Sequence, residues 1–153
     1  MEWRFDNIDD LIRDRKIEGE VGINLKIKEG IILLVRAASD ANPLWKAKAP
    51  KALREIARLR NNGATDAVLN GKIAELYADT LVFGWHGGQQ EDGTLLPGGP
   101  IMNGQIVPFS RDACVGFLTI ADDAIDALWS YCRDTQNFRE ARNTAVVDET
   151  VKS

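Results

Sequence analysis

The sequence has few of the residues from which metal sites and nucleophilic sites are usually built. Among 153 residues it has one histidine, His86, and two cysteines, Cys114 and Cys132. The cysteines do not form a C-x-x-C pair, and one imidazole does not complete the ligand set of a zinc site. In a cytosolic chain such cysteines are most often reduced side chains of the core. We therefore expect no metal site.

The sequence also lacks a long apolar run. The longest, residues 31–35, is far shorter than the roughly 18 residues that span a bilayer. The first six residues include Glu2, Arg4 and Asp6 and have no apolar h-region, so they do not resemble a secretory signal. We expect the protein to stay in the cytoplasm of the cell that makes it, with no membrane partner.

Basic residues are scarce in the second part of the chain. Residues 61–153 have 6 Lys/Arg against 13 Asp/Glu, whereas residues 1–60 have 13 against 10. An acidic half argues against broad contact with a phosphate backbone, so nucleic acid is not an expected partner. The basic excess lies largely on one predicted helix, where it is typical of a solvated face: Lys46, Lys48, Lys51, Arg54, Arg58 and Arg60.

Apolar alternation predicts a β-hairpin near the amino terminus. Between residues 21 and 28, Val, Ile, Leu and Ile alternate with Gly, Asn and Lys, which is the period of a half-buried strand. Glu29-Gly30 forms a turn, and residues 31–36 form a second strand rich in β-branched side chains. Two strands alone are marginally stable, so helices or a third strand must cover them.

The rest of the pattern is mainly helical. Pro50 suits the first position of a helix to about Arg60, with a kink between it and an earlier turn at residues 43–48. Thr65 starts a second helix that we expect to reach Phe83, which gives an antiparallel αα-hairpin. Further helix starts are predicted at Asn7, at Ser110 and at Asp122 or Asp123, with a last turn around Phe138.

The expected fold class is therefore α+β, with a small β-hairpin or sheet packed on about five helices. We expect one domain over residues 1–143 and a flexible polar tail over residues 144–153. Residues 84–108 contain seven of the thirteen glycines and three of the five prolines, and read as a long loop. Such loops are uncommon in a compact domain and are often functional or mobile.

None of the candidate motifs predicts an active site or a cofactor site. The glycine-rich loop has no GxxxxGK[ST] motif and no strand–glycine–helix order, so it does not predict phosphate binding. Asp122, Asp123 and Asp126 lack the spacing of a calcium loop and are explained as helix-start carboxylates. A Cys–His dyad with His86 has no sequence signature. These absences favour a protein that binds other proteins, with no cofactor.

Two tryptophans are candidates for different roles. Trp85 ends the second predicted helix and is placed to pin the long loop onto the core, with a partner contact as the alternative. Trp45 follows Pro43, and we expect it to be an exposed anchor because aromatic side chains dominate protein-binding hot spots.

An ordered series of short segments runs through the chain: Leu34-Val35-Arg36, Asp40-Ala41-Asn42-Pro43, residues 78–85, Asp92-Gly93, residues 108–112 and residues 134–138. This series resembles the tail assembly chaperones of long-tailed bacteriophages, over about residues 21–140. The matching positions are expected to be mainly structural: Trp85, Asp92, Gly93, Pro108, Phe109, Ser110, Asn137 and Phe138. Residues 93–107 form an insertion relative to that pattern, which leaves the role of the loop open.

The resemblance implies a non-enzymatic role in the host cytoplasm. Proteins of that family bind the tape-measure protein, keep its aggregation-prone helices soluble and bring tail-tube subunits to it. For partner contact we predict two regions: Leu44, Trp45 and the basic face of Lys48, Lys51 and Arg58, and the loop near Ile101 and Met102.

Two other classes stay open from the sequence. One is a structural tail-completion or connector protein that is retained in the virion. The other is an enzyme or small-ligand binder, which a ligand would stabilise against unfolding. The oligomeric state, a homo-oligomer included, is not predicted.

Overall fold

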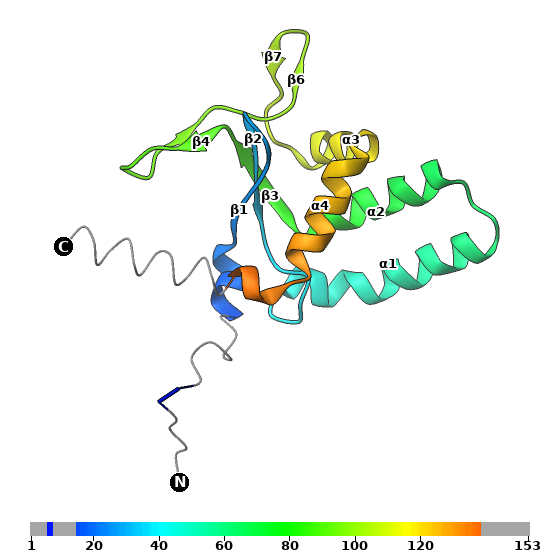
Figure 1. Ribbon diagram of the computed structural model, residues 1–153. Coiled ribbons are helices and arrows are strands. Elements are labelled where there is room, and N and C mark those ends of the chain that lie inside the picture. Colours follow the sequence, from blue (N-terminus) through cyan, green and yellow to red (C-terminus); the bar gives the residue numbers. More distant parts are fainter. Residues whose placement is uncertain (1–5, 8–14, 139–153) are drawn as a thin grey trace.

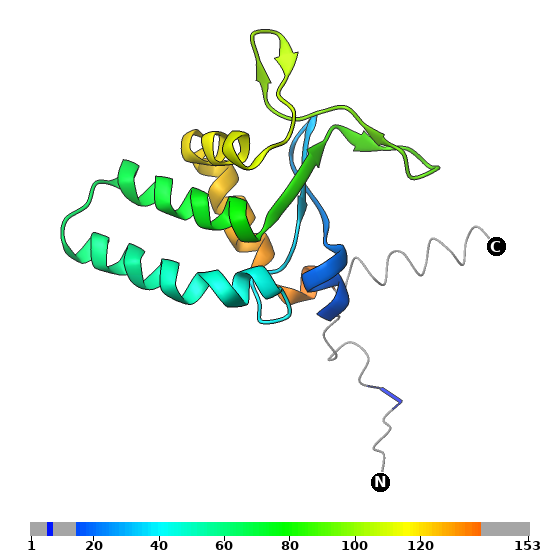
Figure 2. The same ribbon diagram turned by 180° about the vertical axis from the view of Figure 1, so that it is seen from behind.

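The computed structural model describes residues 6–7 and 15–138, and the α+β class is confirmed. The helices lie to one side of a three-stranded sheet, and two small hairpins project from one end (Figures 1 and 2). Most of the helix predicted at Asn7 and the predicted tail at residues 144–153 lie outside the described residues. The elements are η2 (Ile17–Val21), β1 (Ile23–Lys28), β2 (Ile31–Val35), α1 (Pro43–Asn61), α2 (Asp66–Thr80), β3 (Val82–His86), β4 (Gly88–Gln89), β5 (Leu95–Leu96), β6 (Ile101–Met102), β7 (Gln105–Ile106), α3 (Arg111–Ile120) and α4 (Asp122–Cys132).

The predicted β-hairpin is confirmed as β1 and β2. The two strands pair antiparallel with Leu25 opposite Leu33, and both of these side chains are buried. The third strand, β3, pairs with the other edge of β2 and places Trp85 opposite Leu33. The expectation that the second helix reaches Phe83 was therefore wrong. This segment forms a strand because β2 offers it a free edge and an apolar face, which helix propensity alone does not register.

The predicted helix start at Pro50 was also wrong, because α1 is one helix that begins at Pro43 and has Pro50 inside it. The helix begins earlier because Asn42 caps it: its side-chain oxygen accepts from the backbone N–H of Leu44 at 3.2 Å. The side-chain amide of Asn42 also donates to the carbonyl oxygens of Ala37 at 3.0 Å and Thr80 at 2.8 Å. Asn42 thus ties the start of α1 to the end of α2.

The predicted αα-hairpin is confirmed, with α2 antiparallel to α1 (Figure 1). The hydroxyl of Thr65 accepts from the N–H of Val68 at 3.3 Å and starts α2. Ser110 caps α3 in the predicted way, with a 3.1 Å hydrogen bond from Ala113. The core between these helices and the sheet includes the predicted thiols Cys114 and Cys132, both free and buried.

Residues 84–108 are more structured than the long loop that we predicted; the short strand expected within residues 105–108 is present as β7, and β4, β5 and β6 were not predicted. After β3 they form two small hairpins, β4–β5 and β6–β7. Asp92-Gly93 lies in the turn of the first, and Asn103-Gly104 forms the turn of the second, with φ values of 55° and 76°. Positive φ at both central residues is what a type I′ two-residue hairpin turn requires, and Asn-Gly meets that requirement. Within residues 15–138, no helix combines the length and apolar character needed to cross a bilayer.

Candidate protein-binding surface

The side chain of Trp85 holds the β6–β7 hairpin against the core. Its indole Nε1 donates to the carbonyl oxygen of Val107 at 2.9 Å. Its ring meets Phe109 edge-on, with centroids 4.9 Å apart, and Phe117 at 6.1 Å. A Cβ on Gly99 would lie 2.6 Å from the indole, so the chain can pass over this ring only as glycine. The prediction that Trp85 pins this region to the core is confirmed.

An apolar cleft of about 530 Å³ opens between β6–β7 and α3. Three of its side chains are conspicuously accessible: Ile120 is 84% exposed, Ile101 69% and Met102 64%. Large apolar side chains gathered in one place are more typical of an interaction surface than of ordinary protein surface. No lining residue carries a charge: Trp85, Pro100, Ile101, Met102, Val107, Ala113, Gly116, Phe117, Ile120 and Ala121.

The charged groups beside this cleft are mainly acidic. A second hollow, also about 530 Å³, shares Phe117 and Ala121 with the cleft and is lined by Asp122, Asp123 and Lys28 as well. Both aspartates are exposed in the first turn of α4, where the helix dipole favours them. Neither forms an ion pair with another described residue.

Arg111, the cation at the start of α3, is already paired with carboxylates. Arg111 donates to Asp79 of α2 at 2.9 Å and to Asp112 at 3.4 Å. Hydrogen bonding to Asp79, and then the charge of that carboxylate, raise the pKa of Arg111 above its ordinary value. This pairing joins α3 to α2 and does not offset the acidic groups at the start of α4.

The predicted surface on α1 is only partly as expected. Leu44, Lys48, Lys51 and Arg58 are all exposed, and their spacing of three, four or seven residues places them along one stripe of the helix. Trp45 is not the exposed anchor that we predicted. It is half-buried, with its ring 5.9 Å from that of Trp129 and 6.5 Å from that of Tyr77.

The spacing of the apolar residues explains the position of Trp45. Trp45, Ala49, Ala52 and Ile56 recur every three or four residues, so they share the inward face of α1. This signal was available in the sequence but was obscured by placing the helix start at Pro50.

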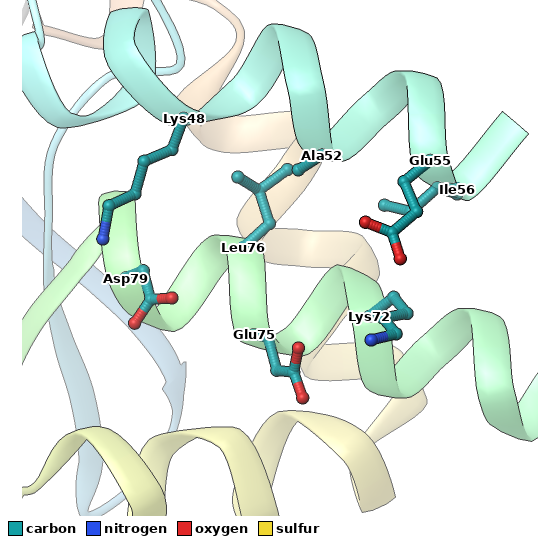
Figure 3. A pocket seen from close by; sticks show the side chains of 8 residues that line it. All are labelled: Lys48, Ala52, Glu55, Ile56, Lys72, Glu75, Leu76 and Asp79. Carbon is teal, nitrogen blue, oxygen red and sulfur yellow. The ribbon is translucent and has the colours of Figure 1, made fainter.

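A smaller groove of about 170 Å³ lies between α1 and α2 (Figure 3). Its floor is apolar, and both walls carry charges of mixed sign. Lys48 extends from α1 toward the end of α2 that carries Asp79, yet Asp79 is ion-paired with Arg111. The groove is too small and too mixed in charge to define a ligand class; its lining is Lys48, Ala52, Glu55, Ile56, Lys72, Glu75, Leu76 and Asp79.

The titratable core groups are held in structural contacts. His86 lies on β3, with Nε2 2.9 Å from Asn24 Oδ1 and Nδ1 3.0 Å from the carbonyl oxygen of Gly88. Burial, with a smaller contribution from Asp79, raises the pKa of Cys114 to about 12, and burial raises that of Cys132. Neither thiol bonds His86. In the described part of the chain, no three His, Cys, Asp or Glu side chains are placed to share a metal ion.

The two predicted contact regions are not brought together. Ile101 and Met102 lie on the cleft, whereas α1 lies at the other end of the molecule in both views (Figures 1 and 2). Sequence reasoning missed Ile120 as a surface residue. Its signal was a second apolar stripe on α3, at 113, 117 and 120, beside the buried pair Cys114 and Leu118.

Comparisons with protein-family models, with curated proteins and with solved structures find no significant match to this chain.

Proposed function

We propose that this protein is a non-enzymatic tail assembly chaperone of a long-tailed bacteriophage. In this role it binds the tape-measure protein in the host cytoplasm and helps to recruit tail-tube subunits. The observation that carries the proposal is the apolar cleft with Ile101, Met102 and Ile120 exposed on its rim. A chaperone that masks the apolar faces of helices needs such a surface.

The positions that carry the family resemblance support the same proposal. Trp85 and Phe109 pack edge to face beneath the β6–β7 hairpin. Ser110 begins α3, which forms the other wall of the cleft. These motif residues would therefore build the support of the binding surface, while Ile101 and Met102 lie in the segment that is an insertion relative to the family pattern.

The test is co-expression with the tape-measure protein of the same genome, followed by a pull-down from the soluble fraction. We expect the tape-measure protein to become soluble and to co-purify with the wild-type chain. The variant Ile101→Ser/Met102→Ser should lose this effect. The control Val68→Ser changes an exposed apolar residue on α2, away from the cleft, and should retain it.

The opposite result would favour another role. If the tape-measure protein stays insoluble and unbound while this chain is abundant in purified virions, the protein is a structural tail component.

A further inference from the structure

We infer that the apolar cleft binds a basic amphipathic helix, that is, a partner segment with apolar side chains on one face and Lys or Arg beside it. This inference rests on the proposed protein-binding role and adds the chemistry of the partner. It depends on three features: what lines the cleft, how short its strands are, and which charges lie beside it.

The lining favours a helix over an extended peptide. An extended peptide gains its affinity from a row of backbone hydrogen bonds along a strand edge. The strands β6 and β7 have two residues each, too few for such a row. The cleft instead offers side chains, with Ile120, Phe117 and Ala113 at helical spacing on one wall and Ile101 and Met102 on the other. An apolar helix face with anchors at i, i+3, i+4 and i+7 matches a surface of that kind.

The charged groups beside the cleft favour a positively charged partner helix. The cleft has no charged lining residue, and the adjoining hollow has Asp122 and Asp123 against the single cation Lys28. Arg111 is occupied by Asp79 and Asp112. A helix with basic flanks would meet two carboxylates that have no ion-pair partner in residues 15–138, whereas acidic flanks would be repelled by them.

Two synthetic amphipathic helices of about 18 residues test this directly. They share one leucine pattern, and their polar faces carry either Lys or Glu. Isothermal titration with the full chain should show the Lys helix binding at least about tenfold more tightly than the Glu helix. Raising the salt from about 50 mM to about 500 mM should reduce that difference, because salt screens exposed charges.

Variants of exposed residues locate the binding site without disturbing the core. Asp122→Asn/Asp123→Asn should lower the preference for the Lys helix about fivefold to tenfold. The control Asp66→Asn/Glu91→Gln removes two exposed carboxylates that line neither hollow and should leave it unchanged. Ile120→Ser should weaken binding of the Lys helix about tenfold with an unchanged melting temperature.

Several outcomes would overturn the inference. Equal, salt-independent binding of both helices would remove the charge selection, and binding of neither would remove the cleft as a helix site. A dimer that Ile120→Ser dissociates would make a second copy of the chain the occupant of the cleft.

Co-expression separates this inference from the proposed function. If Ile120→Ser and Asp122→Asn/Asp123→Asn still solubilise the tape-measure protein, this inference fails while the proposed function stands. If the Lys helix binds but the wild-type chain leaves the tape-measure protein insoluble, the proposed function fails instead.

Discussion

The cleft between α3 and β6–β7 and the outer stripe of α1 both expose side chains, but of different kinds. The α1 stripe exposes one leucine, Leu44, among lysines and arginines, as the solvent side of an amphipathic helix normally does. The cleft exposes Ile101, Met102 and Ile120 together, above the buried Trp85. Charge on a helix surface needs no partner, whereas clustered apolar side chains lower their free energy when a partner covers them. This difference is why we propose the cleft, and not the α1 stripe, as the binding surface.

The largest effect should come from removing the support of the cleft. Trp85→Ala should lower the free energy of unfolding by about 3–5 kcal/mol, because it empties a buried aromatic site and removes the hydrogen bond to Val107. Urea unfolding followed by circular dichroism measures this. Trp85→Phe keeps most of the apolar volume and should cost only about 1–2 kcal/mol. An alanine variant as stable as the wild type would mean that Trp85 does not stabilise the packing of the hairpin on the core.

The next effect concerns the other end of the molecule. Asn42→Ala should cost about 2 kcal/mol, because α1 loses its cap and the buried carbonyls of Ala37 and Thr80 lose a donor. The control Asn62→Ala changes an exposed residue at the end of α1 and should stay within about 0.5 kcal/mol of the wild type. Similar losses for the two variants would contradict the role given to Asn42.

Alkaline pH should test two buried groups of the core on neighbouring helices. Burial raises the pKa of Cys114, on α3, and that of Tyr77, on α2, each to about 12. The folded state keeps these protons where the unfolded chain releases them, so stability is complete below about pH 9 and falls as pH rises toward 12. Each group should lower the free energy of unfolding by up to about 1.4 kcal/mol for each pH unit above its ordinary pKa.

Denaturant titrations between about pH 8 and pH 11, in Cys114→Ala and in Tyr77→Phe, assign the pH dependence of stability to each group. Each variant should have a shallower dependence on pH than the wild type. A slope that neither variant changes would place the titration elsewhere in the chain.

The smallest effect should be that of the α1 charges on partner binding. Lys51→Gln/Arg58→Gln should change affinity for the tape-measure protein by less than about 0.5 kcal/mol, as exposed charges commonly do. A quantitative pull-down alongside Ile101→Ser measures it. If the α1 variant abolishes binding while Ile101→Ser retains it, the binding surface is α1 and not the cleft.

The parts of the fold that sequence reasoning predicted depend on local chemistry. Apolar alternation predicted β1, a β-branched-rich run predicted β2, and the hydroxyls of Thr65 and Ser110 marked two helix starts. The parts that it missed depend on distant contacts. Val82–His86 becomes a strand because β2 lies beside it, and α1 continues through Pro50 because Asn42, held by Ala37 and Thr80, starts it earlier.

The candidate site was predicted only in outline. Ile101 and Met102 were singled out because they lie in an unusual glycine-rich segment. The opposite wall, with Ile120, was not, because apolar residues on a helix are ordinarily assigned to the core, and only the packing of α3 shows which of its two stripes is covered.

The place of the αα-hairpin in the chain has a consequence for how the protein folds. In sequence, α1 and α2 both come between β2 and β3, which are neighbours in the sheet. The two ends of this segment meet where the N–H of Arg36 donates to the carbonyl of Leu81 at 2.8 Å. The third strand can therefore dock only after this long excursion has closed on itself, whereas the β1–β2 turn can form at once. Collapse of the helical pair should set the rate at which the sheet is completed, and with it the time at which the apolar cleft between α3 and β6–β7 forms.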